Sequence, residues 1–195
     1  MKMKKFKVSI LVCALISICS WNAGAQEINL RPPSPTQTIK QQFALSELSV
    51  TYSRPSAKGR VIIGDLVPYD AVWRTGANAS TKISFGEDVK IAGKDVPKGE
   101  YALYTIPGKS EWTIILSKNT TLGGAAGYKQ EEDLVRFKVA SEELPMSIET
   151  FTIQFANFKP ESIDFQMMWE RTAVSFTIST DIDTRLMKQI NEAMS

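Results

Sequence analysis

Apolar and polar residues alternate along most of this chain, and this period of two constrains the fold more than any other feature of the sequence. In one stretch, Leu48, Val50 and Tyr52 are separated by Ser49 and Thr51. Successive side chains of a strand point to opposite faces, so this alternation predicts a strand with one buried face. The same pattern predicts further strands at 83–85, 89–91, 101–106, 112–116, 135–139, 151–155, 163–169 and 174–178.

Turn-forming residues separate these runs at short intervals, as in IAGKD (91–95), VPKGE (96–100), NFKPES (157–162) and WERT (169–172). Glycine adopts positive φ and proline fixes φ, and both properties help a chain to reverse. Many short strands at this spacing predict a mainly β protein, an antiparallel β-sandwich or jelly-roll-like domain, over residues 38–180. Residues 118–134 depart from the pattern and predict a long loop.

The end of the chain changes from strand to helical spacing. Ile182, Leu186 and Ile190 recur at intervals of four, and Thr180 or Asp181 is suited to cap the start of a helix. We therefore predict a C-terminal helix over residues 181–195. We expect it to cover a sheet edge or an open end of the sandwich.

The first 25 residues have the three parts of a secretory signal peptide. Four lysines precede an apolar run from Val8 to Ser20, and the small residues of 23–25 suit cleavage before Gln26. Residues 1–25 therefore predict export to the periplasm or the extracellular space, and the Pro-rich residues 26–37 predict an extended lead-in. No later run is long and apolar enough for a transmembrane segment.

Charge disfavours nucleic acid as a partner. The whole chain carries a formal charge of +2, but removal of the four signal-peptide lysines changes this to about −2. No Lys/Arg stripe remains to bind phosphates, so we expect no nucleic-acid binding. The sequence does not predict an oligomeric state.

The residue types that are missing exclude much catalytic chemistry. The chain has no histidine, and its two cysteines, Cys13 and Cys19, both lie in the predicted signal peptide. A Ser-His-Asp triad, a Cys-His pair and His- or Cys-based zinc sites are therefore excluded. We assign no catalytic residues, no metal ligands and no cofactor, and expect a protein that is not an enzyme. A hydrolase that uses only carboxylates is the remaining enzymatic alternative.

Four stretches carry a family resemblance: PSPTQTIKQQF, VTYSRPSAKGR, VWRTGANAST and YALYTIPGKSEWTIILSK. Together they resemble the bacterial family called domain of unknown function 2911, found in exported proteins of Bacteroidetes, over about Pro32 to Ile178. The resemblance implies one secreted β-rich domain and no particular activity. The residue after the Asn of VWRTGAN is often Glu in that family, whereas this chain has Ala79.

One cluster of residues is a candidate ligand site. Trp73, Arg74 and Asn78 lie within six positions, and Arg54 and Lys58 precede them. An aromatic ring, a guanidinium and an amide suit a carbohydrate or a small anionic ligand. The same groups also suit a loop anchor, because Arg and Asn side chains hydrogen-bond to neighbouring backbone.

Three classes of function follow. The first is a non-catalytic binding module for a carbohydrate or small anionic ligand at Arg54, Lys58, Trp73, Arg74 and Asn78. The second is a structural or protein-interaction domain of the cell envelope, and the third is the carboxylate-based hydrolase.

Overall fold

The computed structural model describes residues 32–194. The predicted signal peptide at 1–25 and the first part of the lead-in, 26–31, lie outside the described residues.

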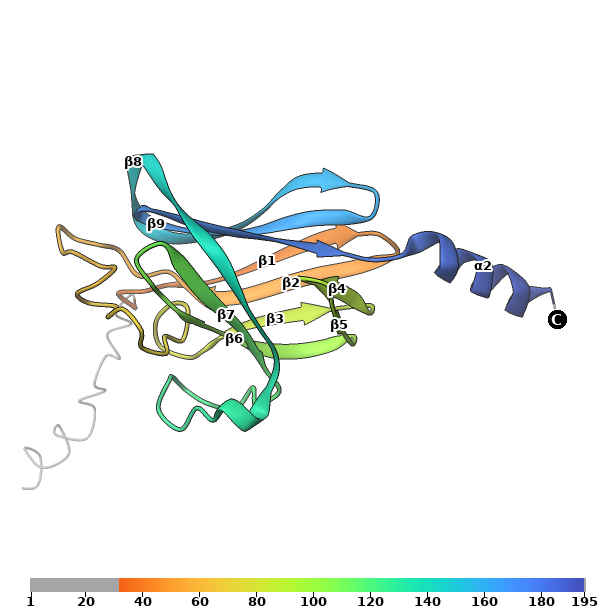
Figure 1. The fold of residues 1–195 in the computed structure, drawn as a ribbon, viewed down its shortest axis with the longest axis horizontal. Coiled ribbons are helices and arrows are strands. Elements are labelled where there is room, and N and C mark those ends of the chain that lie inside the picture. Colours follow the sequence, from red (N-terminus) through yellow and green to blue (C-terminus); the bar gives the residue numbers. More distant parts are fainter. Residues whose placement is uncertain (1–31, 195) are drawn as a thin grey trace, which may run out of the picture. The chain divides into compact units, whose positions relative to one another are not determined.

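Nine strands in the described part of the chain form one antiparallel sheet, in the order β1-β2-β3-β6-β7-β8-β9-β4-β5 (Figure 1). Their bounds are β1 Thr36–Phe43, β2 Ser46–Ser53, β3 Thr81–Phe85, β4 Val89–Ile91, β5 Lys94–Val96, β6 Gly99–Ile106, β7 Glu111–Ser117, β8 Asp133–Lys159 and β9 Ser162–Ser179. The prediction of a mainly β, antiparallel domain is confirmed. The sheet does not close into a barrel.

The single sheet folds over on itself into two layers, and the long strands β8 and β9 run from one layer into the other. The first part of β8 pairs with β7, and its last part pairs with β9, whose own end pairs with β4. The core lies between the two layers. The rings of Tyr52 on β2 and Phe151 on β8 meet edge to face, with centroids 5.7 Å apart, as do those of Phe137 and Phe176. Burial of the alternating apolar residues between the layers is the main stabilising term.

At two places where the sequence predicts that a strand ends, the structure has a continuous strand with a local irregularity. The runs at 135–139 and 151–155 belong to the single strand β8, whose register with β9 shifts near Pro145, a residue without an N–H for the ladder. The predicted turn at 169–172 is also wrong, because β9 continues through it. Glu170 there has a φ of 49°, which is typical of a bulge rather than a reversal.

The predicted loop at 118–134 contains a 3₁₀ helix, η2, at Gln130–Glu132, and β8 starts at Asp133. The part of the loop before η2 covers the outer face of β6 and β7. There Leu122 and Tyr128 pack against the buried Tyr104 and Ile115.

The end of β2 caps the free edge of the second half of β8. The Tyr52 hydroxyl accepts a hydrogen bond from the Ile153 N–H at 2.9 Å. The Arg54 guanidinium donates through Nε to the Phe151 carbonyl at 3.2 Å and through Nη2 to Thr152 Oγ1 at 3.0 Å. The backbone continues this contact, since the Phe151 N–H donates to the Pro55 carbonyl. These bonds satisfy strand groups that would otherwise be orphaned inside the protein.

The helix α2, Ile182–Ala193, follows β9, and Asp181 caps it by accepting a hydrogen bond from the Thr184 N–H at 3.0 Å. The expectation that this helix covers the sandwich is wrong. Its apolar residues Leu186, Met187 and Ile190, together with its C-cap Met194, are 38–81% exposed, and the helix extends beyond the end of β9 (Figure 1). The reason is the ion pair of Arg185 with the buried Glu87, which turns the polar face of α2, rather than its apolar face, toward the domain.

The described residues include no helix that is long and apolar enough to cross a membrane.

We predict that Tyr52→Phe destabilises the fold by about 1–3 kcal/mol, because the buried Ile153 N–H loses its acceptor while the ring packing is retained. Chemical denaturation monitored by tryptophan fluorescence measures this change. Tyr69→Phe is the matched control, because Tyr69 is partly exposed and should change stability little. Equal stability of the two variants would contradict the capping role of Tyr52.

We also predict that the protein loses stability in alkaline solution. Burial raises the pKa of the Tyr52, Tyr101 and Tyr104 hydroxyls above the ordinary value of 10.0. Because the folded pKa is the higher one, this contribution is complete below about pH 10 and is lost as the pH rises through the folded-state pKa. Unfolding free energies measured from about pH 9 to about pH 11 should therefore fall, and fall less steeply in Tyr52→Phe. A flat profile would contradict this.

Candidate functional site

Trp73 is anchored within the fold at the loop that leads into β3. Its backbone pairs with Thr105 of β6 through hydrogen bonds of 2.7 and 3.0 Å. Its ring stacks on Trp169 with centroids 5.9 Å apart and meets the rings of Trp112 and Phe151 edge to face. The indole N–H donates to the Gly76 carbonyl at 3.0 Å. Trp73 is therefore a packing residue of the core.

The loop after Trp73 has a backbone that few residues can adopt. Thr75 is fully buried with a φ of 56°. Gly76 has a φ of 148°, and a Cβ at this position would lie 2.9 Å from the Ser53 carbonyl oxygen. Only glycine combines that φ with so close an approach to another strand.

Arg74 lies between this loop and the glycine-rich loop at 118–129. Its Nη1 donates to the Asn78 carbonyl at 3.0 Å. A Cβ at Gly124 would come within 2.9 Å of the same nitrogen, so the missing side chain of Gly124 makes room for the guanidinium. Two further bonds tie the loops together, from Ser80 Oγ to the Leu122 carbonyl and from the Tyr104 hydroxyl to the Gly124 carbonyl.

Asn78 holds the loop against the end of β2. It has a φ of 59°, a conformation that Asn tolerates. Its amide donates to the Ser34 carbonyl and to Ser53 Oγ, both at 3.2 Å. Ser53 precedes Arg54, so the structure brings Asn78 to the same end of the sandwich as Arg54.

The two earlier cations differ in their surroundings. Arg54 is half-buried and bonded to β8, as described above. Lys58 is exposed with a φ of 53°, and its backbone N–H donates to the Glu149 carboxylate at 2.9 Å. None of the ion pairs among residues 32–194 involves Arg54, Lys58 or Arg74.

The contacts of Arg74, Asn78 and Trp73 are those that a loop anchor requires, because each side chain bonds to backbone. The ligand-binding role of Arg54, Lys58, Trp73, Arg74 and Asn78 stays a prediction. Sequence reasoning missed the contribution of Gly124, which lies 50 residues from Arg74 in the chain. The glycine pair at 123–124 was visible, but nothing in the sequence placed it beside Arg74.

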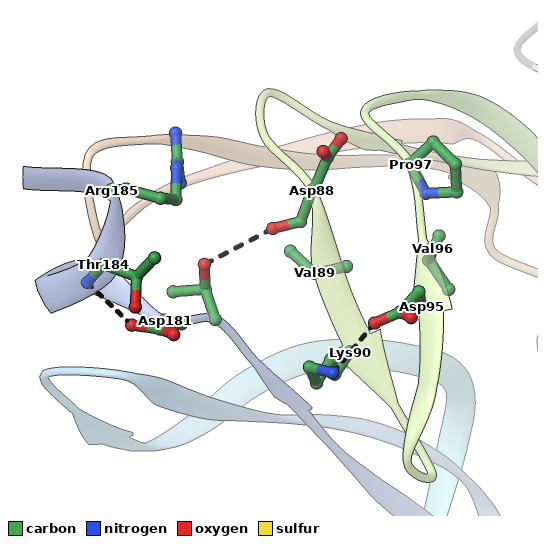
Figure 2. Close-up of a pocket in the computed structure, with 10 residues that line it drawn as sticks. Asp88, Val89, Lys90, Asp95, Val96, Pro97, Asp181, Thr184 and Arg185 are labelled. Carbon is green, nitrogen blue, oxygen red and sulfur yellow. Dashed lines mark hydrogen bonds and ion pairs between the residues drawn. The ribbon is translucent and has the colours of Figure 1, made fainter. Parts of the chain in front are cut away.

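A pocket of about 300 Å³ lies at the opposite end of the domain, between the β4–β5 hairpin and the start of α2 (Figure 2). Val89 and Val96 give it a buried apolar floor. Its charged groups already have partners, since Lys90 pairs with Asp95 at 2.9 Å and Arg185 with Glu87 at 2.5 Å. The pocket therefore offers mainly apolar contacts to a ligand.

Asp181 on the rim of this pocket has a lowered pKa because the Thr184 backbone N–H and hydroxyl bond to its carboxylate. An acid stabilised in its ionised form is a poor proton donor near neutral pH. Among the described residues, no group of three or more carboxylates is arranged to hold a metal ion.

The model of a family described as "Protein of unknown function (DUF2911)" matches residues 34–178. The chain belongs to this family. The match covers the described domain from two residues before β1 almost to the end of β9, and it leaves out α2. Neither the curated proteins nor the solved structures contain a significant match.

We predict that Gly76→Ala destabilises the domain by about 1–3 kcal/mol, because alanine is strained at this φ and its Cβ collides with the Ser53 carbonyl. Chemical denaturation is the measurement. Gly59→Ala is the control, because Gly59 also has a positive φ, 72°, but has open space around it. If Gly76→Ala cost no more than Gly59→Ala, the close approach of the loop to β2 would be disproved.

Proposed function

We propose that this protein is an exported, non-catalytic binding domain for a small anionic ligand, held between the loops at 73–80 and 118–129. The signal-peptide features of residues 1–25 support export, and the lack of histidine and of cysteine beyond residue 19 supports a binding role over catalysis.

The observation that carries the proposal is the state of Arg74. Arg74 as a whole residue is half-buried, its guanidinium has five N–H donors, and among residues 32–194 that guanidinium makes one hydrogen bond, to the Asn78 carbonyl at an exposed position. No carboxylate among residues 32–194 pairs with it. A guanidinium that has unused N–H donors and no carboxylate partner can form charge-assisted hydrogen bonds to an anion held between the loops.

The other predicted residues support Arg74 in different ways. Lys58 and Arg54 add positive charge at this end of the domain, which attracts an anion over a distance. Asn78 and Trp73 fix the loop that holds Arg74. Because the ring of Trp73 packs against three other aromatic rings, it is poorly placed to stack on a sugar, and we favour an anion over a carbohydrate.

We expect inorganic phosphate or a small dicarboxylate to raise the melting temperature of the protein, and Arg74→Ala to abolish that increase. Differential scanning fluorimetry with succinate, phosphate and sulfate, against chloride at equal ionic strength, is the measurement. Arg171→Ala is the control, because Arg171 is an exposed arginine that already pairs with Glu143 at 3.2 Å. No stabilisation of the wild-type protein by any of these anions would count against the proposal, as would an unchanged response in Arg74→Ala.

A second pair of variants tests whether the anion response depends on the position of the Arg74 guanidinium and not only on the net charge of the protein. Gly124→Ala keeps every arginine but displaces the Arg74 guanidinium, so it should reduce the anion response. Gly123→Ala adds a methyl group where nothing lies within 4 Å, and should leave the response unchanged. Arg74→Ala should also lower the melting temperature without ligand, because the bond to Asn78 is lost.

A specific observation favours the interaction domain as a second candidate function. The C-terminal helix α2 exposes four large apolar side chains on one face. This feature lies at the other end of the domain and is independent of the anion site.

A further inference from the structure

The apolar face of α2 has no partner within the described chain. Leu186, Ile190 and Met194 are spaced four residues apart and so lie along one side of the helix, with Met187 beside them. Their exposed fractions run from 38% for Leu186 to 81% for Met194. A helix with a continuous apolar stripe normally buries it against another element.

The base of α2 is fixed to the sandwich by polar contacts on its other face. Arg185 reaches Glu87 in the β3–β4 turn, a carboxylate that is only 2% exposed. Glu161 in the β8–β9 turn accepts a hydrogen bond from the Ile182 N–H at 3.1 Å. These contacts set the direction of the helix, so the stripe is presented to solvent in a fixed orientation.

The rest of the helix depends on a partner for stability. Twelve residues is a marginal length for an isolated helix in water, where packing of an apolar face supplies most of the stability. Beyond its first turn, α2 stands clear of the sheet (Figure 1). The structure thus presents a helix that needs a packing surface and does not find one among residues 32–194.

We propose that the occupant of this stripe is a second copy of the chain, whose α2 packs antiparallel to the first. The residues that flank the stripe, Gln189 and Asn191, are uncharged, so two identical stripes can meet without like-charge contacts along their length. Pairing with a different helical partner is usually set by charges at such flanks. The helix sequence holds two acidic and two basic residues, and this balance does not favour an anionic membrane as the alternative occupant.

The antiparallel direction follows from Asp183, which falls on the apolar side at the start of the helix. A parallel pair would place the two Asp183 carboxylates side by side. An antiparallel pair separates them to opposite ends and leaves Leu186 and Ile190 of each copy at the centre. Since each sandwich then lies at an opposite end of the helix pair, the two domains do not collide.

Two turns at the base of α2 extend the apolar surface that such a partner would meet. The β8–β9 turn, which bonds to Ile182, follows the exposed Phe158, and the β1–β2 turn next to Gly86 exposes Leu45. In an antiparallel pair the end of the partner helix, with its exposed Met194, returns toward this end of the domain. The arrangement is isologous, as most dimers of identical chains are.

The oligomeric state tests the proposal directly. Sedimentation velocity of the purified protein over a range of concentrations should show a monomer–dimer equilibrium. Ile190→Glu should raise the dimer dissociation constant at least about tenfold, because it places a charge at the centre of the interface. The control Leu66→Glu adds the same charge at a residue of comparable exposure, 49%, in the long loop between β2 and β3, and should leave dimerisation unchanged. Neither variant alters the core, and circular dichroism verifies folding.

Cross-linking tests the direction of the helices, because the described residues contain no cysteine. Gln189 lies near the two-fold axis of an antiparallel pair, so Gln189→Cys should form a disulfide-linked dimer under mild oxidation. Ala193→Cys should not, since its equivalent lies near the far end of the partner helix. A wild-type monomer at all concentrations, a dimer that survives Ile190→Glu, or efficient cross-linking by Ala193→Cys would overturn the proposal. None of these results bears on the anion site at Arg74.

Discussion

The fold depends on how the second half of β8 completes its hydrogen bonds after it leaves β7. Its inner edge pairs with no full strand, and the end of β2 supplies the missing groups instead: the Tyr52 hydroxyl, the Arg54 guanidinium and the Pro55 carbonyl. If the N–H and C=O groups of this buried strand edge had no partners, the fold would be destabilised by the desolvation cost of each unpaired group. This cap allows a single sheet to fold into two layers that enclose an aromatic core.

The same cap links the core to the candidate anion site. Ser53 lies next to the capping residues, and its hydroxyl accepts a hydrogen bond from the side-chain amide of Asn78. The carbonyl of Ser53 lies close to Gly76. The loop at 73–80 is therefore fixed between the cap on one side and Trp73 in the core on the other. Arg74 is carried by a rigid support, which is the condition for an anion to be bound without the cost of ordering a loop.

The two ends of the domain differ in chemistry. At one end, Arg54, Lys58 and Arg74 form no ion pair within residues 32–194. The end that holds α2 pairs its charges, including the buried Glu87 with Arg185, and leaves apolar surface free. The proposed anion site and the proposed helix interface therefore use separate surfaces, and one domain can carry out both roles at once.

The sequence by itself determined the mainly β class, most of the strand segments, the C-terminal helix and the exclusion of catalysis by histidine. Alternation such as Leu48–Tyr52 depends on local geometry, and the lack of histidine requires no fold. The sequence also grouped Trp73, Arg74 and Asn78, which are close in the chain. Only the tertiary structure decided that Pro145 and Glu170 lie within continuous strands, that Gly124 makes room for Arg74, and that α2 turns its apolar face to solvent. Each of these outcomes depends on groups far apart in the chain, such as Glu87 and Arg185, whose meeting is set by packing and not by local preference.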